Sequence, residues 1–127
     1  MSDTLKGVVV SHAGLAQALV AAAENISGVT DALVAVTNEG CDGGALQARI
    51  GEAIGSGPAV VFVDLPGGSC LAGAVRTARG QGRGVSVVTG VNLAMLLDFV
   101  FHRELAPADA AQRAVDAGGR AIRIPPA

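Results

Sequence analysis

The chain has 127 residues, half of them apolar and almost none aromatic, and its formal net charge is −2. The absence of a basic stripe and of Trp and Tyr argues against a nucleic-acid-binding protein, which needs phosphate-binding cations and stacking surfaces. The length predicts a single domain over residues 1–127, with a core large enough to fold without disulfides.

The cysteines and the N-terminus bear on the cellular compartment. Cys41 and Cys70 are the two cysteines of the chain, too few for a disulfide framework, so both are expected to be reduced thiols. No export signal is visible at the N-terminus. No stretch approaches the roughly 20 apolar residues of a membrane span. The sequence therefore predicts a soluble cytoplasmic protein.

The first predicted strand ends beside a histidine. Leu5 to Val10 is an apolar, largely β-branched run typical of a buried strand, and His12 follows two residues after it. Gly14 then opens a helical pattern that continues to Asn25. We therefore expect His12 at the carboxyl end of a strand, near the start of a helix, where ligands bind in open α/β sheets.

The middle of the chain repeats the alternation of strand and helix. Ala32 to Val36 predicts the second strand, and Asp42 is placed to cap a helix that runs to about Ile54. Gly55-Ser56-Gly57-Pro58 carries the glycine and proline signals of a helix end. Ala59 to Val63 is a continuous apolar run, which is typical of a parallel strand covered on both faces.

The last part of the chain adds two more strands and three helices. Residues 71–78 have a helical pattern, and residues 85–88 predict the fourth strand, which a further helix follows. Pro107 suits the first turn of the last helix, which we expect to stop at Gly118-Gly119. Arg120–Ile124 alternates charged and apolar residues, which predicts a half-exposed edge strand.

This order of elements predicts an α/β protein with one doubly wound sheet. Right-handed crossovers leave few arrangements, of which the flavodoxin-like strand order 2-1-3-4-5 is the natural choice. In that order the topological switch point lies between strands one and three. His12 leaves strand one there and Asp64 leaves strand three, so the two side chains are expected to meet.

A histidine paired with a carboxylate can act as a nucleophile. One ring nitrogen of His12 needs a free lone pair, and Asp64 can accept a hydrogen bond from the other nitrogen and stabilise the positive charge that develops. Alone, His12 would more often be a core or capping histidine, and Asp64 is as often a helix cap. Their expected meeting at one edge of the sheet favours the functional interpretation.

The turn Gly67-Gly68-Ser69 supplies backbone N–H groups and a hydroxyl before a helix. That arrangement suits an anion such as a phosphoryl group, although a short glycine-rich turn is as often only a tight connection. The chain has no Walker lysine and no GxGxxG, so no nucleotide is indicated. Beside His12, the turn suggests a phosphohistidine whose oxygens are received by Gly67, Gly68 and Ser69, without a metal or a cofactor.

Three segments carry a resemblance to a known family. Gly7–Gly14 (GVVVSHAG), Val63–Ser69 (VDLPGGS) and Thr89–Leu97 (TGVNLAMLL) resemble the mannose-type IIA domain, the fructose/mannose subfamily EIIA, of the bacterial phosphoenolpyruvate:sugar phosphotransferase system. The resemblance covers almost the whole chain. It implies a flavodoxin-like fold with four parallel strands and a C-terminal antiparallel edge strand, and commonly a homodimer.

The resemblance also implies roles for individual residues. His12 matches the histidine that accepts a phosphoryl group from the carrier protein HPr and passes it to a IIB partner for sugar uptake. Asp64 matches its carboxylate partner, Ser69 the loop serine near the phosphoryl group, and Asn92 an asparagine that supports the neighbouring loop. The membrane is reached only indirectly, through a transporter. Cys70 stands where many members have proline. It could be a reactive thiol whose pKa is lowered by the helix N-terminus, or a small buried side chain that fills space, and the second interpretation is favoured.

Other interpretations remain open. A regulatory protein that reports phosphorylation state would keep His12 but lack a dedicated transporter. A phosphotransfer subunit of a dihydroxyacetone kinase is expected to carry a Met-Gly-Ser-type turn, so Gly67-Gly68-Ser69 favours the mannose-type branch. Hydrolysis by Ser69, His12 and Asp64 is disfavoured, because no GxSxG nucleophile elbow is present. Arg120–Ile124 is consistent with strand pairing across a dimer, since bare edges invite it.

Overall fold

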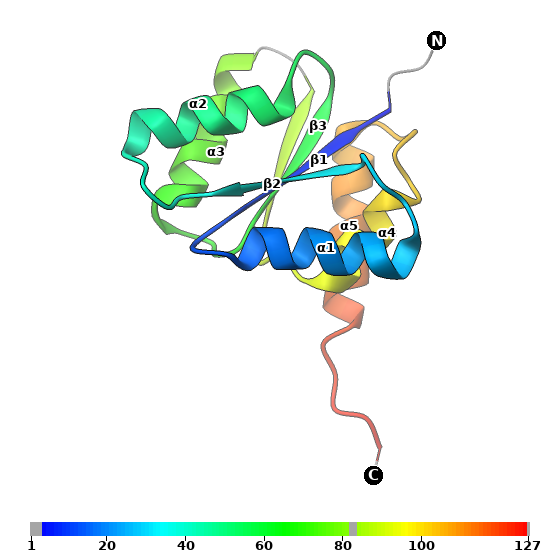
Figure 1. The fold of residues 1–127 in the computed structure, drawn as a ribbon. Helices are drawn as coiled ribbons and strands as arrows, with labels where there is room; N and C mark the ends of the chain where they lie inside the picture. Colours follow the sequence, from blue (N-terminus) through cyan, green and yellow to red (C-terminus); the bar gives the residue numbers. More distant parts are fainter. Residues whose placement is uncertain (1–3, 82–83, 127) are drawn as a thin grey trace.

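A computed structural model describes residues 4–81 and 84–126 of the chain. Four parallel strands form one sheet in the order β2-β1-β3-β4 (Figure 1). This order confirms the flavodoxin-like arrangement predicted for the first four strands. The strands are β1 (Lys6–Ser11), β2 (Leu33–Thr37), β3 (Ala59–Val63) and β4 (Val85–Thr89).

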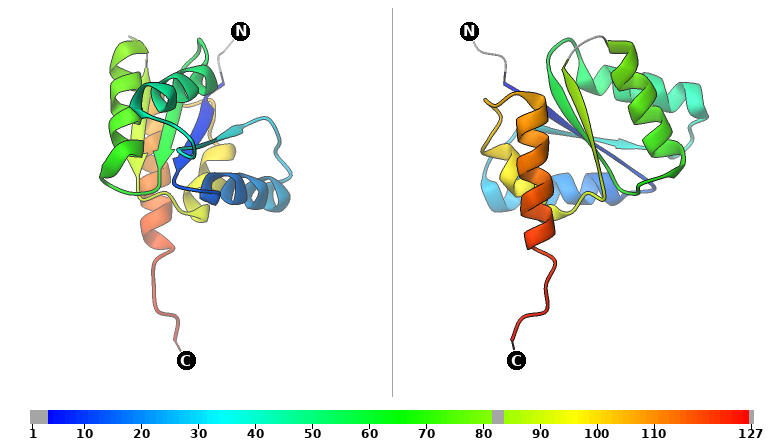
Figure 2. Two further views of the ribbon diagram at one scale, coloured as in Figure 1. Left: turned by 60° about the vertical axis from the view of Figure 1, so that its left-hand side comes forward. Right: turned by 180° about the vertical axis from the view of Figure 1, so that it is seen from behind.

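Helices cover both faces of the sheet, as the two further views show (Figure 2). One layer holds α2 (Gly43–Ile54) and α3 (Gly68–Gln81), and the other holds α1 (Leu15–Ser27), α4 (Leu93–Val100) and α5 (Pro107–Arg120). Asp42 caps α2 as predicted, because its side chain accepts a 2.8 Å hydrogen bond from the Ala45 amide. Within the described residues, no helix is long and apolar enough to cross a membrane.

The two central strands divide the core into two halves. Side chains of a strand point alternately to opposite faces, so Val9 and Phe62 pack toward α1, α4 and α5, while Val10 and Val63 pack toward α2 and α3. Phe62 meets Phe99 of α4 edge to face, with ring centroids 5.3 Å apart. Every residue of β3 is buried, which explains its unbroken apolar sequence.

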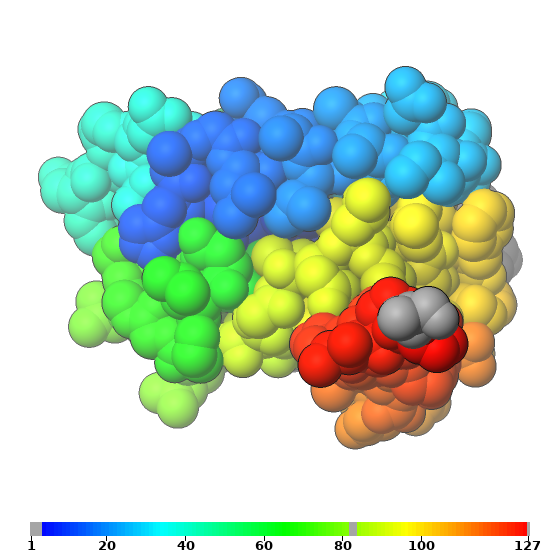
Figure 3. Space-filling view, turned by 90° about the horizontal axis from the view of Figure 1, so that it is seen from below, coloured from blue at the N-terminus to red at the C-terminus, as the bar shows by residue number. Residues whose placement is uncertain are grey.

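The register of β1 and β3 brings their ends together. Val10 lies opposite Val63, and the Asp64 amide donates to the Val10 carbonyl at 3.2 Å. In the same way the Val91 amide donates to the Val63 carbonyl at 3.0 Å. The first residues of each loop are therefore hydrogen-bonded to the end of the neighbouring strand. Seen from below, the segments that leave the carboxyl ends of β1, β3 and β4 lie side by side, in blue, green and yellow (Figure 3).

Helix α5 is longer than predicted. It does not stop at Gly118-Gly119 but runs through both glycines to Arg120. Gly118 is buried, and a Cβ at that position would lie 2.6 Å from Cγ of Met95. The glycine is therefore a packing residue that lets α5 approach α4, rather than the end signal that the sequence suggested.

The predicted fifth strand over Arg120–Ile124 is not formed in the described chain. Arg120 ends α5, and residues 121–126 pair with none of the described strands and extend away from the domain body (Figure 1). Ile122 and Ile124 are 77% and 97% exposed. An alternating sequence becomes a strand only when a neighbour supplies the second half of the hydrogen-bond ladder, and among residues 4–81 and 84–126 no such neighbour lies along the tail.

Candidate functional site

His12 and Asp64 meet at the carboxyl edge of the sheet, as the predicted topology required. Nδ1 of His12 lies 2.8 Å from Oδ2 of Asp64, and the same oxygen accepts the His12 backbone N–H at 2.9 Å. The His12 side chain is 43% exposed, whereas that of Asp64 is only 8% exposed. The carboxylate thus fixes the ring through Nδ1, and no hydrogen bond of the described chain engages Nε2, the nitrogen that can act on a ligand.

The loop after β1 is held in an unusual conformation. Ala13 has a φ of 52°, the left-handed region that side chains other than glycine rarely adopt. Two contacts from the end of β2 hold it there, since Thr37 Oγ1 donates to the Ala13 carbonyl at 2.7 Å and Asn38 Oδ1 accepts from the Ala13 amide at 3.3 Å. Buried Ser11 accepts from the Ala16 amide at 2.6 Å and fixes the start of α1.

Sequence reasoning missed the supporting residues Thr37 and Asn38. Their signal was present, because a polar pair follows the strand next to β1 and must reach the same edge of a parallel sheet. The left-handed turn at Ala13 has no such signal in the sequence. Thr37 and Asn38 therefore position the backbone next to His12 rather than take a direct part in the chemistry.

The predicted anion-binding turn lies at the start of α3. Gly67, Gly68 and Ser69 are all exposed, and Gly68 has a φ of +87°, which requires glycine. The first amides of a helix have no partner within the helix and carry its positive dipole end. Ser69 lies in the first turn of α3, at the same edge of the sheet as His12, but no hydrogen bond joins the two among the described residues.

Cys70, the next residue, is the group of α3 that reaches His12. It is fully buried, and its Sγ lies 3.9 Å from Nδ1 of His12. Burial and the nearby Asp64 charge raise the pKa of the Cys70 thiol, outweighing the hydrogen bond from Ser69. The thiol is therefore protonated near neutral pH, which agrees with the favoured buried filler and not with a thiol activated by the helix terminus.

The pKa of Asp64 lies below its ordinary value. Burial raises this pKa, but the hydrogen bonds from the backbone and ring of His12, the charge of the imidazole and the Leu65 amide together lower it more strongly. Asp64 is therefore a carboxylate at neutral pH. It can hold the Nδ1 proton in place and stabilise positive charge on the ring.

Asn92 and His102 lie outside this contact group. Asn92 caps α4 by accepting from the Met95 amide at 3.0 Å, and its own amide donates to the Gly118 carbonyl of α5 at 3.1 Å. These contacts cap α4 and join it to α5. His102 bonds the Asp98 carbonyl at 2.7 Å, close to the end of α4. It has no contact with His12 in the described residues.

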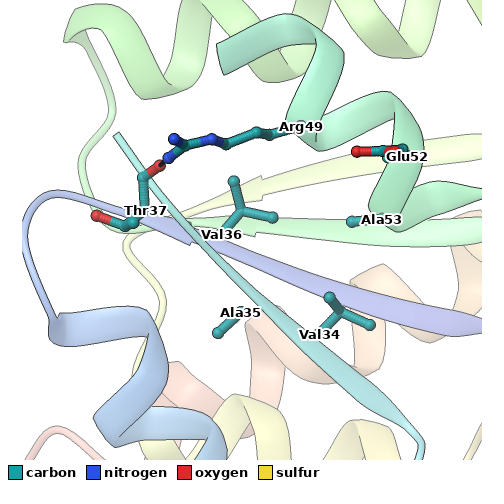
Figure 4. Close-up of a pocket in the computed structure, with 7 residues that line it drawn as sticks. All are labelled: Val34, Ala35, Val36, Thr37, Arg49, Glu52 and Ala53. Carbon is teal, nitrogen blue, oxygen red and sulfur yellow. Dashed lines mark hydrogen bonds between the residues drawn. The ribbon is translucent and has the colours of Figure 1, made fainter. Parts of the chain in front are cut away.

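A separate hollow of about 500 Å³ lies beside the edge strand β2 and helix α2 (Figure 4). Arg49 spans it and donates to the carbonyls of Thr37 and Glu39 at 3.1 Å each. Neither His12 nor Asp64 lines the hollow, so it is not where the candidate chemistry takes place. The residues that line it are Val34, Ala35, Val36, Thr37, Arg49, Glu52 and Ala53.

A parallel sheet of order 2-1-3-4, helices on both faces and polar residues at the carboxyl edge define a flavodoxin-like α/β protein. The sequence model of the family described as "PTS system fructose IIA component" (EIIA-man) matches residues 6–115, and the chain belongs to this family. It is thus a IIA component of the phosphotransferase type, which carries a phosphoryl group. No curated protein matches the chain.

Solved structures show the same fold. The phosphotransferase system component EIIA from Streptococcus agalactiae is 19% identical, with a TM-score of 0.87 over 94% of this chain and 96% of that one. The mannose/sorbose specific IIA subunit from Enterococcus faecalis is 24% identical, with a TM-score of 0.82 over 98% and 97% of the two chains. A sigma-54 interaction domain protein from Enterococcus faecalis is 13% identical, with a TM-score of 0.79 over 97% and 96%.

Proposed function

We propose that Nε2 of His12 accepts a phosphoryl group from HPr and donates it to a IIB partner of a sugar transporter, in the cytoplasm. The observation that carries this proposal is the 2.8 Å contact between Nδ1 of His12 and Oδ2 of Asp64 in an otherwise open site. The carboxylate occupies one ring nitrogen, which leaves the other as the nucleophile. Family membership supplies the general phosphotransfer role.

The transfer is an in-line displacement at phosphorus between two histidines. A bond forms between Nε2 of His12 and phosphorus while the bond from phosphorus to the donor histidine breaks, and the electron pair returns to the donor ring. The Nδ1 proton of His12 stays in place, and Asp64 balances the positive charge of the ring. The amides of Gly67 and Gly68 and the hydroxyl of Ser69 receive the phosphoryl oxygens at the start of α3.

The experiment that tests the proposal is phosphorylation of the purified chain by phosphoenolpyruvate, the first enzyme of the system and HPr. Wild type should gain acid-labile phosphate, and His12→Ala should gain none. The matched control is His102→Ala, which removes the other histidine of the chain and should be phosphorylated like wild type. Labelling of His12→Ala, or no labelling of wild type, would sink the proposal.

A regulatory reporter of phosphorylation state is the second candidate. It is favoured by the occurrence of this fold in the sigma-54 interaction domain protein. The two roles differ in the acceptor: a carrier passes its phosphoryl group rapidly to a IIB component encoded beside it, whereas a reporter keeps it. Incubating phosphorylated chain with the IIB components of the source organism separates them. A dihydroxyacetone kinase subunit would instead transfer to that kinase.

Hydrolysis through Ser69 is the weakest candidate. A serine nucleophile needs its hydroxyl within hydrogen-bond reach of the histidine that activates it. The described residues show no hydrogen bond between Ser69 and His12. Labelling of Ser69 by a serine-directed fluorophosphonate would reverse this conclusion.

A further inference from the structure

Three side chains of different chemistry converge behind the exposed face of His12. Ligand atoms of His12, Asp64 and Cys70 all lie within 4.8 Å of one another, and Nδ1 of His12 is 2.8 Å from Oδ2 of Asp64 and 3.9 Å from Sγ of Cys70. They come from three segments of the fold, namely the loop after β1, the loop after β3 and the first turn of α3. An imidazole, a carboxylate and a thiol are the three ligand types that Zn²⁺ accepts in proteins.

The distances between these atoms suit a tetrahedral ion after a small adjustment. Zinc–ligand bonds of about 2.0–2.3 Å place neighbouring ligand atoms roughly 3.3–3.6 Å apart. Here Nδ1 lies 3.9 Å from Sγ and 2.8 Å from Oδ2, one pair slightly too wide and the other slightly too narrow. Shifts of about half an ångström, within the reach of side-chain rotation, give both pairs the required spacing.

We propose that this chain binds a thiophilic divalent cation such as Zn²⁺ through Nδ1 of His12, Oδ2 of Asp64 and Sγ of Cys70, with the remaining position open to solvent. Binding releases the thiol proton into solution and leaves His12 as the neutral tautomer that carries its ring proton on Nε2, and the carboxylate is already ionised. The thiolate and imidazole exclude Mg²⁺ and Ca²⁺, which prefer oxygen ligands.

The burial of the ligands strengthens this site. Cys70 is fully buried and Asp64 nearly so, while the half-exposed His12 provides the entry path. An ion held here is attracted to the carboxylate in surroundings that screen charge poorly. It also takes the lone pair of Nδ1 and engages Asp64, so the ring proton stays on Nε2 and that nitrogen has no free lone pair to attack phosphorus. If the proposed function holds, the bound metal therefore blocks phosphorylation of His12.

The first experiment measures metal binding alone, with the reduced full-length chain and Co²⁺ as a spectroscopic probe for Zn²⁺. We expect one Co²⁺ per chain, a thiolate-to-cobalt charge-transfer band and displacement of Co²⁺ by Zn²⁺. Cys70→Ser should abolish the band and weaken Zn²⁺ binding at least about tenfold. Cys41→Ser is the matched control, because Cys41 lies outside the cluster, and it should keep both the band and the affinity.

Either of two results would overturn the metal site: no charge-transfer band in wild type, or a band that survives in Cys70→Ser. Cys70→Ala serves as a second variant, and far-UV circular dichroism of each variant shows whether the fold is retained. This binding experiment does not depend on phosphotransfer, so its failure and the failure of the proposed function are separate results.

The second experiment tests the consequence with purified phosphorylated HPr as donor. Zn²⁺ at a concentration that saturates wild type should lower its phosphorylation rate at least about tenfold, as expected when a metal occupies the site of the reacting group. Cys70→Ser should be much less affected at the same concentration, which also controls for any effect of Zn²⁺ on HPr. Equal inhibition of wild type and Cys70→Ser would contradict the link between metal and site.

Discussion

At the scale of single residues, one carboxylate oxygen of Asp64 accepts two hydrogen bonds. Oδ2 accepts both the backbone N–H and the ring Nδ1 of His12, so a single group fixes the position of the loop and the direction of the ring. Oδ1 accepts from the Leu65 amide at 3.0 Å, which anchors the carboxylate itself. The side chain is nearly buried, so water competes little for these bonds.

Asp64→Asn keeps the shape of this residue but removes its charge. The ring of His12 then loses its acceptor and the balance for its positive charge, and we expect phosphorylation by phosphorylated HPr to slow by about 10²-fold or more. Rapid-quench measurement of the labelled chain gives the rate. Glu52→Gln, which removes an exposed charge on α2, should leave the rate unchanged. Equal rates for wild type and Asp64→Asn would show that the carboxylate plays no part in the transfer.

The lowered pKa of Asp64 also links stability to pH. Because this pKa is lower in the folded than in the unfolded chain, the carboxylate stabilises the fold above its ordinary pKa, and this contribution is lost as pH falls through the folded-state value. We expect the unfolding free energy of wild type to exceed that of Asp64→Asn at neutral pH. Urea unfolding at a series of pH values should show the difference narrowing below about pH 4. A constant difference would contradict the assignment.

Sequence reasoning found some of these residues and not others for a physical reason. His12 and Asp64 follow predicted strands one and three, and strand order alone brings their backbones together. Cys70 was not expected next to the ring, because that contact depends on how the turn with its left-handed Gly68 starts α3. Periodicity says nothing about such turns. The roles of Thr37 and Asn38 depend in the same way on the φ of Ala13.

At the scale of elements, the packing of α5 on α4 depends on the absence of one side chain. A Cβ on Gly118 would lie 2.6 Å from Cγ of Met95 and 3.1 Å from Oδ1 of Asn92, the atom that caps α4. Gly119, one residue later, has open space at the same position. The two adjacent glycines thus have the same helix propensity and different surroundings.

This difference predicts opposite effects of the same substitution. Gly119→Ala should stabilise the fold by up to about 1 kcal/mol, because alanine is the better helix former. Gly118→Ala gains the same propensity but overpacks the α4 contact, at a cost of about 1–3 kcal/mol, so it should be the less stable variant. Thermal or urea unfolding of the pair measures the effect, each variant serving as the control of the other. Equal stabilities would show that α5 does not pack on α4 as described.

At the scale of helices and strands, the features that depend on local sequence alone were predicted correctly. Unbroken apolar runs identified the buried strands, and the capping residue Asp42 located the start of α2. The end of α5 was predicted wrongly, because glycine next to a tightly packed helix and glycine at a helix end look alike in sequence. Only the position of Met95 distinguishes them.

At the scale of the whole molecule, the C-terminal tail is the part of the described chain that lacks a packed surface. Its two isoleucines, Ile122 and Ile124, are exposed, and its alternating sequence is suited to pair with a strand. The strand predicted at Arg120–Ile124 needs a partner outside this single chain. We therefore propose a homodimer in which the tail of one copy pairs with the other copy.

Light scattering of the purified chain tests this assembly. We expect a dimeric mass for the full chain and a monomeric mass after removal of residues 122–127. Replacement of Ile122 and Ile124 by serine, which keeps the length of the tail, should weaken the dimer as well. A monomeric mass for the full chain at micromolar concentration would remove the proposed dimer and leave the site unaffected.

The hydrogen bonds that join each loop to the neighbouring strand have a further consequence. The amides of Asp64, Val91 and Asn38 each donate to a carbonyl at the end of an adjacent strand, at 3.0–3.2 Å. The backbone beneath His12 is therefore part of the rigid ladder rather than of a mobile lid. We therefore expect a phosphoryl group on His12 to alter the electrostatic potential of this surface without changing its shape. Partners would then distinguish the loaded from the empty protein by charge, not by conformation.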